Sequence, residues 1–255
     1  MNEVVELSEP YYQLNLVVFS YVISVAGSFL ALTSARKIRN SRNEISAINL
    51  LVASTALGGM GVWAMHFTGM LALNLGMGSA YSVLETVLSL VASMGATAVA
   101  FTYVSKDVSS GVRVLLGGVF LGLGITVMHY LGMSGMRFPG YIEWSWLFVV
   151  LSVIIAIIAA SVALWLAFRT KSLVLRWTAS GIMGVAVCSM HYTGMAAAEF
   201  VCTALPVDRF AIPKGFMIVS AIDLPMLTAG VSIGILVLIA YEQALQRIFS
   251  NKTVK

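Results

Sequence analysis

Seven long apolar stretches are the feature that most limits how this chain can fold. They cover residues 12–35, 47–73, 82–104, 114–136, 144–168, 177–198 and 222–241. Each carries at most one charged residue, close to its start, and is about as long as a helix that crosses a bilayer. Inside lipid every backbone polar group must be satisfied, which a helix achieves within one segment. The sequence therefore predicts an all-α integral membrane bundle of seven transmembrane helices.

The composition excludes a water-soluble domain. Of the 255 residues, 59% are hydrophobic and 10% are charged, whereas an ordinary soluble domain has about 25% charged residues. The net charge of +4 does not indicate nucleic-acid binding, because the basic residues lie in short clusters between apolar stretches and form no extended patch. We expect the lipid bilayer, and no nucleic acid, as a partner.

The distribution of basic residues predicts the orientation. If the N-terminus is outside, 12 of the 15 Lys and Arg residues fall in cytoplasmic segments, and the reverse orientation would place them outside. The N-terminus lacks the basic residues of a cleavable signal, so the first helix is expected to be retained. We predict an outer N-terminal tail (1–11), one membrane domain (12–245) and a cytoplasmic C-terminal tail (246–255).

One six-residue motif occurs in three of the stretches. Residues 65–70 read Met-His-Phe-Thr-Gly-Met, residues 128–133 read Met-His-Tyr-Leu-Gly-Met and residues 190–195 read Met-His-Tyr-Thr-Gly-Met. Successive histidines are 63 and 62 residues apart, which is the length of one helical hairpin. The chain therefore contains three repeated helical hairpins plus one helix. All three of its histidines lie in this motif.

The repeated motif predicts a metal site. The three motif helices run in the same direction, so the histidines are expected at one level near the outer face of the membrane. Each histidine shares a helix face with the methionine four residues later, and the glycine between them is expected to let a neighbouring helix approach. Imidazole and thioether donors together favour copper, especially Cu(I). The candidate ligands are His66, His129, His191, Met65, Met70, Met128, Met133, Met190 and Met195.

Other interpretations of these residues remain open at this stage. The motif can be a helix-packing element inherited by duplication, and the methionine before each histidine can pack against lipid. Cys188 is either a further ligand or a small buried residue. Glu85, Glu199 and Asp223 either accept hydrogen bonds from the imidazoles or are solvated charges. The motif aromatics are expected at the outer membrane interface. We see no catalytic constellation and expect no enzymatic activity.

Given this motif, the chain resembles the MHYT domain, a bacterial seven-helix membrane sensor family. Residues 190–193 are the tetrapeptide Met-His-Tyr-Thr itself, while the first copy has Phe67 in place of Tyr and the second has Leu131 in place of Thr. The resemblance extends over residues 12–245. It implies a bacterial inner-membrane location, copper bound near the outer face, and sensing of oxygen, carbon monoxide or nitric oxide.

The resemblance also implies an output. Family members often precede cytoplasmic GGDEF and EAL modules, which make or degrade cyclic di-GMP, so we expect such a module, or a kinase, as a partner if the chain is part of a longer protein. A homodimer is a further possibility. Two other functions are open: copper transport or copper delivery to a respiratory oxidase, and haem binding between the histidine-bearing helices.

Overall fold

The computed structural model describes residues 10–39, 43–170, 172–203 and 208–252. Within these residues, seven helical spans are long and apolar enough to cross a membrane. They are Leu14–Ala35, Ala47–Ala72, Val83–Val104, Gly111–Ser134, Trp146–Arg169, Leu173–Ala196 and Leu224–Tyr241. Each lies within a few residues of a stretch predicted from the sequence, which confirms the seven-helix membrane fold.

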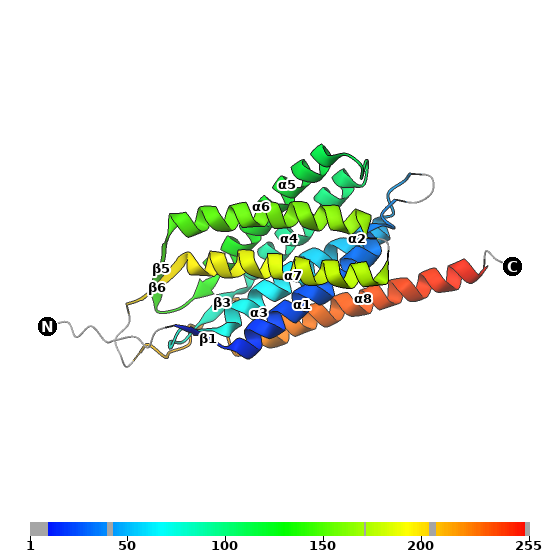
Figure 1. The fold of residues 1–255 in the computed structure, drawn as a ribbon. Helices are drawn as coiled ribbons and strands as arrows, with labels where there is room; N and C mark the ends of the chain where they lie inside the picture. The colour runs from blue at the N-terminus through cyan, green and yellow to red at the C-terminus, as the bar shows by residue number, and fades with distance from the viewer. Residues whose placement is uncertain (1–9, 40–42, 171, 204–207, 253–255) are drawn as a thin grey trace.

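The helices are labelled as in Figure 1. The first span is α1 (Leu14–Ala35), and the second is continuous through α2 (Ala47–Ser54), the π-helix η1 (Thr55–Ala64) and α3 (Met65–Ala72). The remaining helices are α4 (Val83–Val104), α5 (Gly111–Ser134), α6 (Trp146–Arg169), α7 (Leu173–Ala196) and α8 (Leu224–Lys252).

Six of the seven spans form a ring. Neighbours along the chain pack against each other from α1 to α7, and α7 packs back on α1 to close the ring. The three motif-bearing helices (the second span, α5 and α7) alternate around the ring with α1, α4 and α6. The helix α8 packs mainly on η1 from outside the ring. The second span is consequently covered on all sides, and 83% of the residues in its most apolar stretch are buried.

Short antiparallel strands cap one end of the bundle (Figure 1). They form three sheets: β1 (Tyr11–Tyr12) with β2 (Leu73–Asn74); β3 (Ala80–Ser82) between β4 (Met136–Arg137) and β7 (Ile218–Ser220); and β5 (Gly140–Trp144) with β6 (Ala198–Cys202). These strands are not predicted from the sequence, because they have two to five residues and lie in connections between apolar stretches. They tie together the ends of the helices next to the repeated motifs.

The opposite end carries most of the basic side chains that the structure describes. This end is formed by the end of α1 and by the α4–α5 and α6–α7 connections, and its basic residues are Arg36, Lys37, Arg39, Lys106, Arg113, Arg169 and Arg176. The described N- and C-terminal ends lie at opposite ends of the bundle (Figure 1). Of the predicted N-terminal tail, residues 1–9 lie outside the described residues, and Tyr11 belongs to β1. Of the predicted C-terminal tail, residues 246–252 continue α8 and 253–255 lie outside the described residues.

A capping serine starts each motif-bearing helix at the strand-free end. The hydroxyl oxygens of Ser46, Ser110 and Ser172 each accept a hydrogen bond from the backbone N–H three residues later, which satisfies one of the free donors of the first turn. The motif histidine follows its cap by 20 residues in the second span but by 19 in α5 and in α7. The second span therefore has one residue more than its two counterparts, and it alone contains a π-helix.

Candidate metal centre

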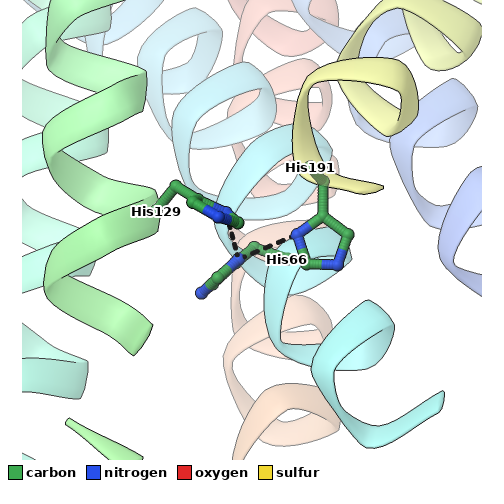
Figure 2. A group of neighbouring side chains, drawn as sticks. All are labelled: His66, His129 and His191. Atoms are coloured by element: carbon green, nitrogen blue, oxygen red, sulfur yellow. Dashed lines mark hydrogen bonds between the residues drawn. The ribbon is translucent and has the colours of Figure 1, made fainter. Parts of the chain in front are cut away.

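The three motif histidines meet in the core of the bundle (Figure 2). Nδ1 of His66 lies 3.0 Å from Nδ1 of His191 and 3.2 Å from Nδ1 of His129. All three side chains are 0% exposed, and one ligand atom from each lies within 4.8 Å of the others. The prediction that the histidines share one level of the bundle is confirmed, and the structure goes further by bringing them into direct contact.

The glycine of each motif makes room for an imidazole from another motif. A Cβ atom built on any of these glycines would lie 2.3–2.4 Å from an imidazole Nε2, far inside van der Waals contact. The pairs form a closed cycle: Gly69 with His191, Gly132 with His66, and Gly194 with His129. The sequence predicts that this glycine lets a neighbouring helix approach, and the structure shows that the group which enters the space is the imidazole of that helix.

The imidazole nitrogens cannot all be satisfied by one another. A neutral ring nitrogen offers either one hydrogen or one lone pair, so Nδ1 of His66 can make only one good hydrogen bond although two nitrogens approach it. The Nε2 atoms of all three histidines are buried and have no hydrogen-bond partner in the part of the chain that the structure describes. Buried polar atoms of this kind are rare, and each needs an explanation.

The six motif methionines are all buried. Their exposed fractions lie between 0% and 3%, for Met65, Met70, Met128, Met133, Met190 and Met195. The alternative in which the methionine before each histidine faces lipid is therefore wrong. The thioethers belong to the same apolar core as the helices that carry the histidines.

Each motif aromatic packs against the histidine that precedes it. Phe67, Tyr130 and Tyr192 stand edge-on to their histidines, with ring centroids 4.8 Å apart in all three copies. The hydroxyl of Tyr130 is 2.8 Å from the Ser152 hydroxyl, and that of Tyr192 is 3.0 Å from the Ser20 hydroxyl. Phe67 is 0% exposed, so the expected interfacial position is wrong for this ring. The aromatics hold the imidazoles in place from the side.

The candidate acidic residues bind elsewhere. Glu85 accepts hydrogen bonds from Ser82 and from Arg137, the latter at 2.8 Å. Asp223 accepts a hydrogen bond from Ser220 at the start of α8. Glu199 lies directly opposite Glu143 in the β5–β6 ladder. The alternative in which these carboxylates orient the imidazoles is thus contradicted.

The cysteines also lie apart from the cluster. Cys188 and Cys202 are free thiols with intermediate burial, and among the described residues the metal-type cluster consists of the three histidines alone. The alternative of Cys188 as a further ligand finds no support in this geometry.

A small apolar cavity of about 20 Å³ lies one helical turn below the histidines, on the side away from the strands. Its lining includes the residue four before each histidine, namely Val62, Ile125 and Val187. The small side chains of α6, including Ala156 and Ala160, form another wall. A cavity of this size holds one small molecule, and an apolar lining keeps such a cavity dry.

A larger pocket of about 570 Å³ opens at the strand-capped end. Met195 of the third motif lines it, together with Tyr12, Trp144 and the carboxylates of Glu143 and Glu199. Burial, with a smaller contribution from Tyr192, raises the pKa of Tyr12 to about 12, so this phenol is neutral at physiological pH. The pocket reaches to within one helical turn of His191.

The fold and the site define a class: a seven-helix membrane protein with a three-fold repeated, buried histidine cluster. The chain belongs to the MHYT family. The family model described as "Bacterial signalling protein N terminal repeat" matches residues 59–118, 122–180 and 184–249. Each match contains one motif and the helix that follows it, so the third copy extends into α8.

Known relatives are signalling proteins. The bifunctional diguanylate cyclase/cyclic di-GMP phosphodiesterase MucR of Pseudomonas aeruginosa is 37% identical over 194 residues, which are 74% of this chain and 28% of that protein. The signaling protein YkoW of Bacillus subtilis is 34% identical over 74% of this chain and 24% of its own length. The cyclic di-GMP phosphodiesterase NbdA of P. aeruginosa is 30% identical over 73% of this chain and 24% of its own length.

The chain spans about a quarter of the length of these curated relatives. No solved structure matches it.

Proposed function

We propose that this chain is the membrane sensory domain of a signalling protein, and that its histidine cluster binds one copper ion through the three Nδ1 atoms. The observation that carries the proposal is the convergence of three Nδ1 atoms in a fully buried core. Metal–imidazole bonds of about 2.0–2.1 Å place two nitrogens on one ion about 3.3–3.6 Å apart. The two separations from His66, 3.0 and 3.2 Å, are a few tenths of an ångström shorter. The ligand atoms of His129 and His191 lie within 4.8 Å of each other, so binding must also bring these two rings to the same spacing.

A bound ion resolves the crowding of the three Nδ1 atoms, while the Nε2 atoms stay beside the motif glycines. It accepts one lone pair from each Nδ1, which leaves the hydrogen of every neutral imidazole on Nε2. The donor set favours copper over zinc, magnesium or calcium, because the motif helices supply neutral imidazoles and buried thioethers and the cluster contains no carboxylate. His66, His129 and His191 are the proposed primary ligands, with Met65, Met70, Met128, Met133, Met190 and Met195 as candidates for further coordination.

We propose that the signal is a diatomic gas, such as oxygen, nitric oxide or carbon monoxide. The cavity of about 20 Å³ supports this, because it is apolar and lies one helical turn from the proposed ion. The orientation of the domain is part of the proposal. The basic end of the bundle faces the cytoplasm by the positive-inside rule, so the N-terminus and the histidines lie toward the outside of the bacterial inner membrane.

The names of the relatives support a cyclic di-GMP output. MucR and NbdA are named as enzymes of cyclic di-GMP turnover, and this chain corresponds to about a quarter of each. We propose that α8 leads to a cytoplasmic output module of the GGDEF/EAL or kinase type, and that this domain itself is not an enzyme. A homodimer would be compatible with such an output.

Copper content tests the proposal. Protein purified in detergent, loaded with Cu(I) and desalted should retain one copper per chain by elemental analysis. The variant with His66, His129 and His191 all changed to Ala should retain none. Retention of no copper by the parent protein, or equal retention by the triple variant, would overturn the proposal.

The geometry is less favourable for the two other functions. Transport needs further ligands along a path, and the cavity below the histidines supplies only the thioethers of Met183 and Met190 among aliphatic side chains. Haem ligation needs room for a porphyrin between two axial ligands, whereas the imidazoles lie in direct contact. Copper flux into vesicles that is lost in His66→Ala would favour transport, and a Soret band in purified protein would establish haem.

A further inference from the structure

From its capping serine to its histidine, the second span is one residue longer than the other two motif-bearing helices. The residues that line the small cavity show where the extra residue lies. Leu121 and Ile125 line the cavity from α5, and Met183 and Val187 line it from α7. Both pairs are four residues apart, the spacing that places two side chains on one α-helical face. In the second span the corresponding pair is Leu57 and Val62, which are five residues apart. The extra residue therefore lies among positions 58–61, inside η1.

The π-helix absorbs this extra residue, since its hydrogen bonds connect residues five apart. At the position where α5 and α7 each have one tightly packed glycine, η1 has two. Gly122 of α5 and Gly184 of α7 pack tightly against α6 and α1, and Gly58 packs in the same way against the backbone of α4. The neighbouring Gly59 points elsewhere: a Cβ atom there would lie 2.8 Å from Cδ1 of Ile235 in α8. The extra residue thus gives η1 a second glycine, on a different side of the helix, and α8 packs against this side.

The helix α8 depends on this contact. It lies outside the ring and packs mainly on η1, and the side chains that it buries in its described part are Leu224, Thr228, Ile235 and Ile239. The family repeat makes α8 the counterpart of α4 and α6, yet α1 fills the corresponding place beside α7. The helix that leads to the C-terminus is therefore seated on the span that carries His66.

We propose that η1 is the coupling element through which a change at the histidine cluster reaches α8. The inference rests on the proposed function, because it needs an ion that moves the imidazoles. Binding must lengthen the nitrogen separations of His66, and the second span is the one motif-bearing helix with an extra residue that can shift. Three glycines fall within four residues of η1, and each lowers helix stability by about 1 kcal/mol relative to alanine. Shifting the extra residue by one position rotates the intervening residues by about 100° and moves them about 1.5 Å along the axis.

Spin labels at positions 112 and 241 test the coupling. Val112 at the start of α5 and Tyr241 at the end of the α8 span are 68% and 62% exposed. Both would be changed to Cys after Cys188 and Cys202 are changed to Ala, and the label distance would be measured by pulsed EPR without metal and with Cu(I), which has no unpaired electron. We expect the label distance to shift by about 1.5 Å or more on copper loading.

Ile235→Ala is the deciding variant, because it removes the contact with Gly59 and leaves the histidines and η1 in place. It should bind copper as the parent does and lose the distance shift. Deletion of Met60, which restores the 19-residue spacing, should also retain copper and lose the shift. Its matched control is deletion of Leu123 in α5, which has no spare residue, so that variant should lose copper.

The outcomes separate the two proposals. A parent protein that binds copper without a distance shift, or an Ile235→Ala variant that keeps the shift, overturns the coupling alone. A parent protein that binds no copper overturns both the coupling and the proposed function.

Discussion

Gly69 and His191 are 122 residues apart in the sequence, yet a Cβ atom on Gly69 would lie 2.3 Å from Nε2 of His191. The same contact recurs in the other two glycine–histidine pairs of the motif. The glycine of each motif thus makes space for the histidine of another motif. Each helix supplies one imidazole and makes space for another, which explains why both residue types occur in every copy.

Gly69→Ala should therefore damage the centre. The new methyl group would push the His191 imidazole away, since a Cβ atom 2.3 Å from Nε2 forces a shift and the ring is fully buried. We expect Cu(I) affinity to fall at least tenfold, measured by competition with a chromophoric chelator. Gly95→Ala in α4 is the matched control, because a Cβ atom there meets nothing within 4 Å. An unchanged affinity in Gly69→Ala would contradict the role assigned to this glycine.

Tyr192→Phe should lower the stability of the protein without abolishing copper binding. The substitution removes the hydrogen bond to Ser20 and reproduces the aromatic residue that the first copy has naturally at Phe67. We expect a loss of stability of about 0.5–1.5 kcal/mol with one copper still bound. Thermal unfolding of Tyr192→Phe, Ser20→Ala and the double variant would measure this, since the two changes should be less than additive. Full additivity would show that the hydroxyls do not interact.

Glu85→Gln should leave copper binding unchanged. The carboxylate pairs with Arg137 at 2.8 Å, and neither residue contacts an imidazole. Because the two side chains are 21% and 39% exposed, the pair is expected to contribute at most about 1 kcal/mol to stability. Loss of copper with an unchanged melting temperature would show that Glu85 acts on the centre after all.

The sequence predicted the spans and the composition of the centre because both depend on local patterns. Apolar stretches of bilayer length identify helices wherever they pack, and the 63- and 62-residue spacing places the three histidines on equivalent helices. The residues between the spans were harder to interpret. The strands pair segments such as 80–82 and 218–220, which are distant in sequence and too short to show a pattern of their own.

The contacts within the centre could not be predicted because they depend on which helices become neighbours in space. The pairing of Gly132 with His66 and the seating of Ile235 on Gly59 are of this kind. One overlooked feature does have a sequence signal. The distance from the capping serine to the histidine is 20 residues for His66 and 19 for His129, which already indicates a surplus residue in the second span.

The central claim is that His66, His129 and His191 bind one copper ion together. X-ray absorption spectroscopy of the Cu(I)-loaded protein tests it most directly, because it reports the atoms bound to the metal. We predict three nitrogen scatterers at about 2.0–2.1 Å with the outer-shell signature of imidazole, and loss of that signature in the triple His→Ala variant. A spectrum with sulfur scatterers alone at about 2.3 Å, or with fewer than three imidazoles, would contradict the account.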